Sequence, residues 1–193
     1  MMNTELNNTI SKIVEINRWL SEFWSNSHGW APEEAAILMS KSRLDRQASL
    51  SKCLRIWDST IHLSNGDGVL ILAWANLGSL IEGTLKLFLA AYYDDYKNDI
   101  EAYKNKKSGN LIDPDQLGLE KLRVFFNKRG LWDKEWSEYT LKVQQYRNAI
   151  HAFKDRNIGT YREYKECVIT YLKMIEQFNL NLPYPDELYI PER

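Results

Sequence analysis

The sequence predicts an all-α protein, an up-and-down bundle of five to six helices. Apolar residues recur every three or four positions along most of the chain, which is the spacing of one face of an α-helix. No segment alternates apolar and polar residues with the period of a strand. Two N-terminal capping patterns, at Asp133 and at Thr160–Glu163, agree with this fold class.

Three helices are expected in the first half of the chain. The first covers about residues 6–25, and the second, with Pro32 suited to its first turn, continues to about residue 57. The sequence Ser-Asn-Gly-Asp-Gly at residues 64–68 breaks the pattern. The third helix, about residues 69–93, is apolar nearly all round, so it is expected to lie at the centre of the bundle.

A polar, lysine-bearing stretch, residues 94–111, is expected to form a surface loop. After it, Asp113 and Pro114 have the chemistry of an N-cap and a first helical position, and Gly130 would end this fourth helix.

Asp133 would cap the fifth helix, which is expected to reach about residue 154. A capping box at Thr160–Glu163 opens the sixth helix. These helices predict one helical-bundle domain over residues 1–182, followed by a short C-terminal tail, residues 183–193.

Composition excludes several classes of protein. The 193 residues, of 22.7 kDa, contain 25 Lys+Arg and 26 Asp+Glu, so the net charge of −1 gives no global attraction for nucleic acid. Two cysteines are too few for a disulfide framework or a structural zinc site, and we expect no metal or cofactor. The longest nearly apolar run, Val69–Ile81, is too short to span a bilayer, so a soluble cytoplasmic protein that avoids membranes is expected.

One segment, residues 144–156, has residues suited to chemistry. Arg147 and His151 are four positions apart, which would make them neighbours on a helix whose Tyr146, Ile150 and Phe153 face the core. A guanidinium binds phosphate and stabilises charge on its oxygens, and a histidine moves protons near neutral pH. RNA supplies its own nucleophile, the 2′-hydroxyl, so such a pair needs no metal.

The run Arg147-Asn148-Ala149-Ile150-His151, late in a helical chain, resembles the motif of the HEPN superfamily (higher eukaryotes and prokaryotes nucleotide-binding). These are small helical bundles, commonly dimeric, and many are metal-independent endoribonucleases of toxin–antitoxin, abortive-infection and phage-defence systems. The resemblance implies that Arg147 binds phosphate, that His151 acts as acid and base, and that Asn148 is their polar companion. Two protomers would form one composite site at the dimer cleft.

The match departs from the family in its spacing. Three residues separate Arg147 from His151, where the family usually has four to six. A second match, Arg55 to His62, has a six-residue gap, but it lacks the polar residue after the arginine and lies too early in the order of helices.

Basic residues around the motif are candidates for RNA binding, namely Lys142, Lys154 and Arg156. Residues 142–165 contain six positive and two negative side chains, an excess of +4, which a solvated helix face would explain equally well. Glu82 lies in the most apolar helix, and a buried carboxylate needs a partner. It could orient Arg147 or accept a hydrogen bond from a Tyr or Trp.

The leading interpretation is therefore a dimeric, metal-independent endoribonuclease that acts on RNA, with an antitoxin or a nucleotidyltransferase as a further partner. The alternative is a non-catalytic HEPN-like dimeric module for binding or scaffolding. A third interpretation, an antitoxin-like helical partner, is less favoured because no disordered neutralising segment is visible in the sequence.

Overall fold

Helices make up nearly all the regular structure of the computed structural model, which describes residues 2–60, 66–151 and 153–185. Among these residues there is no strand, and the one β-type contact is an isolated bridge between Lys104 and Leu111. The predicted all-α class is confirmed. The described helices, in order, are α1 (Met2–Trp24), α2 (Glu33–Lys41), α3 (Leu44–Lys52), α4 (Leu54–Thr60), α5 (Gly66–Ala91), α6 (Tyr93–Asn98), the 3-10 turn η1 (Pro114–Gln116), α7 (Leu119–Arg129), α8 (Lys134–Arg147), the 3-10 turn η2 (Asn148–Ile150) and α9 (Tyr161–Leu180).

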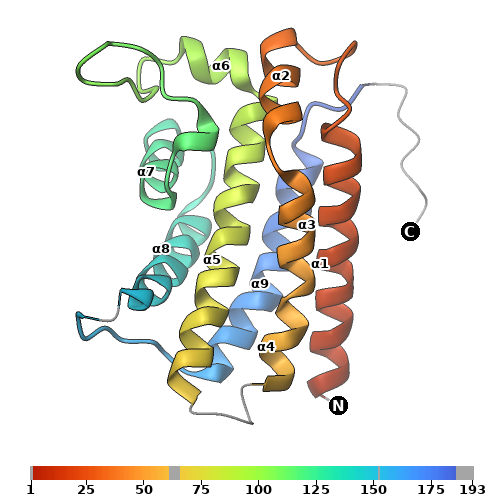
Figure 1. Ribbon diagram of the computed structural model, residues 1–193, viewed down its shortest axis with the longest axis vertical. Helices are drawn as coiled ribbons and strands as arrows, with labels where there is room; N and C mark the ends of the chain where they lie inside the picture. The colour runs from red at the N-terminus through yellow and green to blue at the C-terminus, as the bar shows by residue number, and fades with distance from the viewer. Residues whose placement is uncertain (1, 61–65, 152, 186–193) are drawn as a thin grey trace.

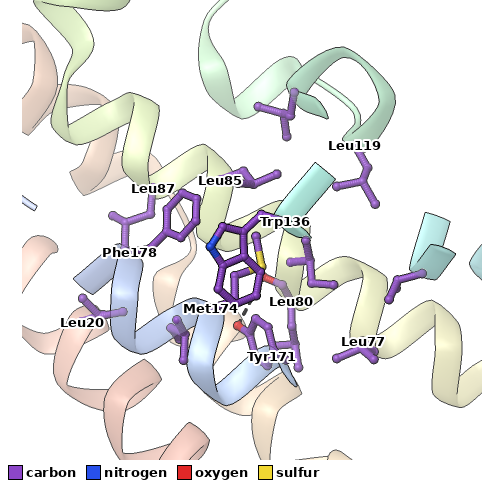
Figure 2. Close-up of a cluster of buried hydrophobic side chains, with 14 of the residues drawn as sticks. Leu20, Leu77, Leu80, Leu85, Leu87, Leu119, Trp136, Tyr171, Met174 and Phe178 are labelled. Carbon is purple, nitrogen blue, oxygen red and sulfur yellow. Dashed lines mark hydrogen bonds between the residues drawn. The ribbon is translucent and has the colours of Figure 1, made fainter. Parts of the chain in front are cut away.

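Helix α5 is the centre of the fold, as its apolar sequence predicts. It packs against α2, α3, α4, α7, α8 and α9, with α1, α3 and α9 to one side of it and α7 and α8 to the other (Figure 1). Side chains of α5, α8 and α9 interdigitate around Leu80, Trp136, Tyr171 and Met174 (Figure 2). Burial of this apolar surface stabilises the bundle.

The same helix is the one described segment whose length and composition would let it cross a membrane. It is longer than the apolar run Val69–Ile81, because the helix continues past Glu82 to Ala91. However, 56% of its most apolar 18-residue window is buried inside the protein. The core helix of a bundle can have this length and composition, and α5 is the helix around which the others pack.

The predicted second helix is divided into three, α2, α3 and α4, and this part of the prediction was wrong. At Ser42 the backbone is extended (φ −71°, ψ 135°), and the Ser42 hydroxyl donates to the Leu38 carbonyl at 2.9 Å. A serine that bonds the preceding turn in this way offers the backbone an alternative to helix. A second interruption, at Cys53, separates α3 from α4.

The start of the fourth predicted helix also differs. Residues 114–116 form only the 3-10 turn η1, and α7 begins at Leu119. Asp113 does not cap a helix, since its carboxylate accepts a hydrogen bond from the Tyr93 hydroxyl at 2.7 Å. Gly130 ends α7 in the left-handed conformation (φ 61°), as predicted.

Both predicted caps in the second half are present. The Asp133 carboxylate accepts from the Trp136 amide at 3.2 Å, and Thr160 and Glu163 form the reciprocal capping box at the start of α9. The short helix α6, residues 93–98, overlaps the start of the predicted surface loop, residues 94–111. Of the predicted tail, residues 186–193 lie outside the described residues, and Tyr184 packs against Trp19 of α1 with ring centroids 5.2 Å apart.

Candidate functional site

Helix α8 ends at Arg147 and does not continue to residue 154 as predicted. The next residues tighten into η2, in which the His151 amide donates to the Asn148 carbonyl at 3.2 Å. His151 itself has φ −84° and ψ 77°, outside the helical region. Arg147 and His151 are therefore not neighbours on one α-helical face, and that part of the prediction is corrected.

The end of the helix also changes which apolar residues reach the core. Tyr146 packs against Trp74 with ring centroids 4.8 Å apart, as predicted. Ile150 is 47% exposed and Phe153 is fully exposed, although both were predicted to face the core. The three-and-four spacing no longer brings them to the core, because the chain leaves the helix between Tyr146 and Ile150.

Arg147 is held by a carboxylate of the central helix. Its Nη1 donates to Glu82 Oε2 at 2.8 Å. The same oxygen accepts the Leu119 amide at 3.1 Å, and the other carboxylate oxygen accepts Lys86 Nζ at 2.8 Å. Of the two partners proposed for Glu82, the arginine is the one observed. The carboxylate thereby joins α5, α7 and α8.

Electrostatics keep this carboxylate ionised. Partial burial alone would raise the pKa of Glu82, but hydrogen bonds from Lys86 and Arg147 outweigh it, and the net result is a lowered pKa. Two cations share one anion, so the cluster of Glu82, Lys86 and Arg147 retains a net charge of +1.

Gly78 makes room for the arginine. A Cβ atom at this position would lie 2.5 Å from Arg147 Cδ, so the aliphatic part of Arg147 lies directly against the α5 backbone. Gly78 and Glu82 are four positions apart, one turn of α5, and together they form the seat of Arg147. This role of Gly78 was not foreseen, although a glycine one turn before a lone acid in an apolar helix was the available signal.

His151 and Asn148 follow Arg147 but do not bond to it. His151 is exposed and Asn148 is half-buried. Within the described residues, neither side chain forms a hydrogen bond, so no hydrogen bond joins His151 to Arg147. His62, from the second motif match, lies outside the described residues.

The predicted RNA-binding cations differ in how free they are. Lys142 forms an ion pair with Glu163 at 3.2 Å, so part of the basic excess of residues 142–165 is neutralised. Lys154 is exposed. Arg156 is half-buried, and its Nε is buried without an acceptor among the described residues.

The loop that contains His151 is anchored at its far end. Trp74 Nε1, on the central helix, donates to the Ile158 carbonyl at 2.8 Å. Gly159 follows with φ 63°, and a Cβ atom there would lie 2.9 Å from the Tyr146 ring, which only glycine tolerates. The segment from Arg147 to Ile158 is thus fixed to α5 at both ends.

Among the described residues, no group of three or more His, Cys, Asp or Glu side chains could hold a metal ion. No protein-family model, no curated protein and no solved structure matches this chain. The function must therefore be inferred from the residues themselves.

Proposed function

We propose that this chain is a metal-independent endoribonuclease of the HEPN type, active as a homodimer in the cytoplasm as part of a toxin–antitoxin or phage-defence system. One observation carries the proposal. Arg147, the arginine of the motif, is seated on Gly78 and oriented by Glu82, and its side chain is still 28% exposed. The arginine is therefore both held in place and partly accessible to a ligand.

The geometry of the guanidinium suits phosphate binding. The guanidinium has five N–H donors, and Nη1 donates to Glu82. The N–H groups of Nε and Nη2 are therefore available for the two non-bridging phosphate oxygens. The carboxylate does not cancel the attraction for phosphate, because Lys86 also binds it and the cluster stays cationic. The arginine would stabilise the charge that builds on those oxygens during cleavage.

His151 supplies the proton transfer in this proposal. A histidine draws the proton from the RNA 2′-hydroxyl, the 2′-oxygen bonds to phosphorus, and the bond from phosphorus to the 5′-oxygen breaks. The 5′-oxygen takes a proton from a second histidine or from water. The products are a 2′,3′-cyclic phosphate and a 5′-hydroxyl. Asn148, Lys154 and Arg156 lie in the same turn and loop, where they would contact flanking phosphates.

The homodimer is supported by the apolar side chains beside the motif. Ile150 and Phe153 are exposed on either side of His151. Burying large apolar side chains is favourable, and aromatic residues are enriched at the cores of interfaces. A second copy that covers them would bring two Arg147/His151 pairs to one cleft. An antitoxin or a nucleotidyltransferase partner would be expected to cover the same face.

The test is cleavage of a mixed RNA pool by the purified protein, with EDTA present. Wild type is expected to cleave RNA and to spare DNA, which lacks the 2′-hydroxyl. His151→Ala should lower the rate by about a hundredfold or more, the range for loss of a general acid or base. His28→Ala is the matched control, because His28 is also exposed but lies between α1 and α2.

The arginine has its own pair of variants. Arg147→Lys should also be poorly active, because a point charge cannot replace the two-pronged guanidinium. Arg162→Lys is the control, since Arg162 is an exposed arginine on α9 that pairs with Glu166. Equal cleavage by wild type and His151→Ala would overturn the proposal.

A second candidate function is a non-catalytic dimeric module for binding or scaffolding. It is favoured by the ion pair between Arg147 and Glu82, and by the absence of a hydrogen bond between Arg147 and His151 among the described residues. It predicts a dimer that does not cleave RNA under any condition tested, while Arg147→Lys and Glu82→Gln lower its stability. Absence of cleavage by a folded, dimeric wild type would decide for this module.

A further inference from the structure

The angle between α2 and α3 opens a pocket against the central helix. Its volume is about 330 Å³, and it is lined by residues of α2, α3 and α5, with Asp115 of η1 at its edge. The pocket lies at the break between α2 and α3, where the chain is extended at Ser42, and both helices contact α5 (Figure 1). Its volume falls at the lower end of the range for small-molecule sites.

The floor of the pocket is apolar. Leu38 and Met39 of α2 and Leu87 and Ala90 of α5 are buried and line it. Four buried apolar side chains around a cavity suit the hydrocarbon or ring system of a ligand, because removing both apolar surfaces from water is favourable.

One wall of the pocket is fixed by a glycine and a glutamine. A Cβ atom at Gly83 would lie 2.2 Å from Gln47 Oε1, so the Gln47 side chain lies flat on α5. Gln47 Nε2 donates to the Leu80 carbonyl at 2.7 Å. This wall is therefore formed before any ligand binds, which lowers the entropic cost of binding.

The rim of the pocket is basic. Its charged lining consists of Lys41, Arg43, Arg46 and Lys86 against one carboxylate, Asp115. Two of these cations already have partners, because Arg43 pairs with Asp45 at 2.6 Å and Lys86 pairs with Glu82 at 2.8 Å.

Lys41 and Arg46 are the rim cations without such a pair. Both are exposed, and neither forms an ion pair within the described part of the chain. They lie on either side of the Ser42 break, one on α2 and one on α3. Because both line the same pocket, we expect a single anionic group at its mouth to contact both.

We propose that this pocket is a binding site for a small amphipathic anion, a molecule with an apolar body and one carboxylate or phosphate group. The apolar body lies on the floor formed by α2 and α5. The anionic group binds Lys41 and Arg46 at the rim, where the arginine fork can hold two oxygens. The pocket shares Lys86 with the Glu82 cluster, but Lys41 and Arg46, which bind the anionic group in this proposal, have no part in the proposed ribonuclease chemistry.

The test uses anilinonaphthalene sulfonate, a fluorescent amphipathic anion, and N-phenyl naphthylamine, its uncharged counterpart. Titration of the full chain is expected to give one saturable site for the sulfonate and much weaker binding of the uncharged compound. The double variant Lys41→Ala/Arg46→Ala should bind the sulfonate with an affinity lower by about tenfold or more, as expected for loss of charge-assisted hydrogen bonds. Lys106→Ala/Lys107→Ala, which removes the same charge from a distant loop, should leave the affinity unchanged.

A second variant tests the cavity without changing charge. Leu50 lines the pocket and is 37% exposed, so Leu50→Trp would fill the space from its open side. This variant should abolish saturable binding while circular dichroism and the melting temperature remain those of a folded protein.

Competition identifies the anionic group. Octanoate and octyl phosphate should displace the probe, and their relative potency distinguishes a carboxylate from a phosphate ligand. Octanol or inorganic phosphate competing equally well would overturn the proposal, because each lacks half of the proposed ligand. Unchanged sulfonate binding in both the Lys41→Ala/Arg46→Ala and Leu50→Trp variants would also overturn it.

Discussion

Arg147 Nη1 and Glu82 Oε2 lie 2.8 Å apart although the two residues are 65 positions apart in the chain. The contact joins the last residue of α8 to the central helix α5. The same carboxylate accepts the Leu119 amide, the first in α7, and so satisfies one of the free donors at that helix start. One side chain thus fixes the positions of three helices, and one of them carries the motif.

This arrangement predicts a measurable coupling between the two residues. In a double-mutant cycle of Glu82→Gln and Arg147→Ala, the free energy of unfolding should show a coupling of about 1–2 kcal/mol, as for contacting charged groups that are mostly buried. Denaturant melts of the four proteins measure it. The exposed pair Lys134 and Glu138, 3.4 Å apart on α8, serves as a control and should show a coupling below about 0.5 kcal/mol.

Acidification should remove the stabilisation that Glu82 provides. The pKa of Glu82 in the folded protein is lowered below the usual 4.5. The folded state therefore stabilises the charged carboxylate more than the unfolded state does. The contribution is therefore fully present above the unfolded pKa and is lost as the pH falls through the folded pKa. The difference in unfolding free energy between wild type and Glu82→Gln should be largest near neutral pH and shrink on acidification. A difference that stays constant from neutral to acid pH would contradict this account.

Gly78→Ala should separate the placement of Arg147 from the stability of α5. The new Cβ would lie 2.5 Å from Arg147 Cδ, so the guanidinium must move from its seat. We expect loss of RNA cleavage. The melting temperature should fall only slightly, because the helical preference of alanine over glycine, about 0.5–1 kcal/mol, offsets part of the stability lost with the ion pair.

Gly68→Ala is the control for this substitution. Gly68 is also in α5, and a Cβ there meets nothing within 4 Å. That variant should be slightly stabilised and as active as wild type. Full activity of Gly78→Ala would show that the seat of Arg147 is not needed for cleavage.

Local signals in the sequence were sufficient for some elements of this fold. The caps at Asp133 and Thr160 were predicted because an N-cap acts on amides two or three residues away, so its signal lies entirely within one segment. Gly130 was predicted as a helix end for the same reason. The break at Ser42 was missed, because a serine in a helical pattern does not by itself tell whether its hydroxyl will bond the preceding turn.

The candidate site was only partly predictable, and its geometry depends on contacts between distant segments. A partner for Glu82 was expected because a buried carboxylate needs one, but the choice of Arg147 is made by the packing of α8 on α5. The end of α8 was missed because Ile150 and Phe153 continue the apolar spacing. Apolar spacing cannot distinguish a face that packs on the core from a face that is exposed in the isolated chain.

Those two exposed side chains lead to the last prediction, which concerns assembly. Phe153 is fully exposed and Ile150 is 47% exposed in one copy of the chain. If a second copy covers them, wild type should sediment as a dimer at micromolar concentration. Replacing both residues by serine should give a 22.7 kDa monomer, because it removes apolar burial of about 1.5–3 kcal/mol for each side chain.

Ile100→Ser provides the matched control for assembly, because Ile100 is 89% exposed and lies just after α6, outside the motif segment. It should remain dimeric. The monomeric Ile150→Ser/Phe153→Ser variant should keep the far-UV spectrum and melting temperature of a folded bundle, since neither side chain contributes to the core. It should also lose RNA cleavage, because the proposed site needs two Arg147/His151 pairs and a monomer has only one. Wild type that sediments at 22.7 kDa, or a serine variant that stays dimeric, would show that this face is not the dimer interface.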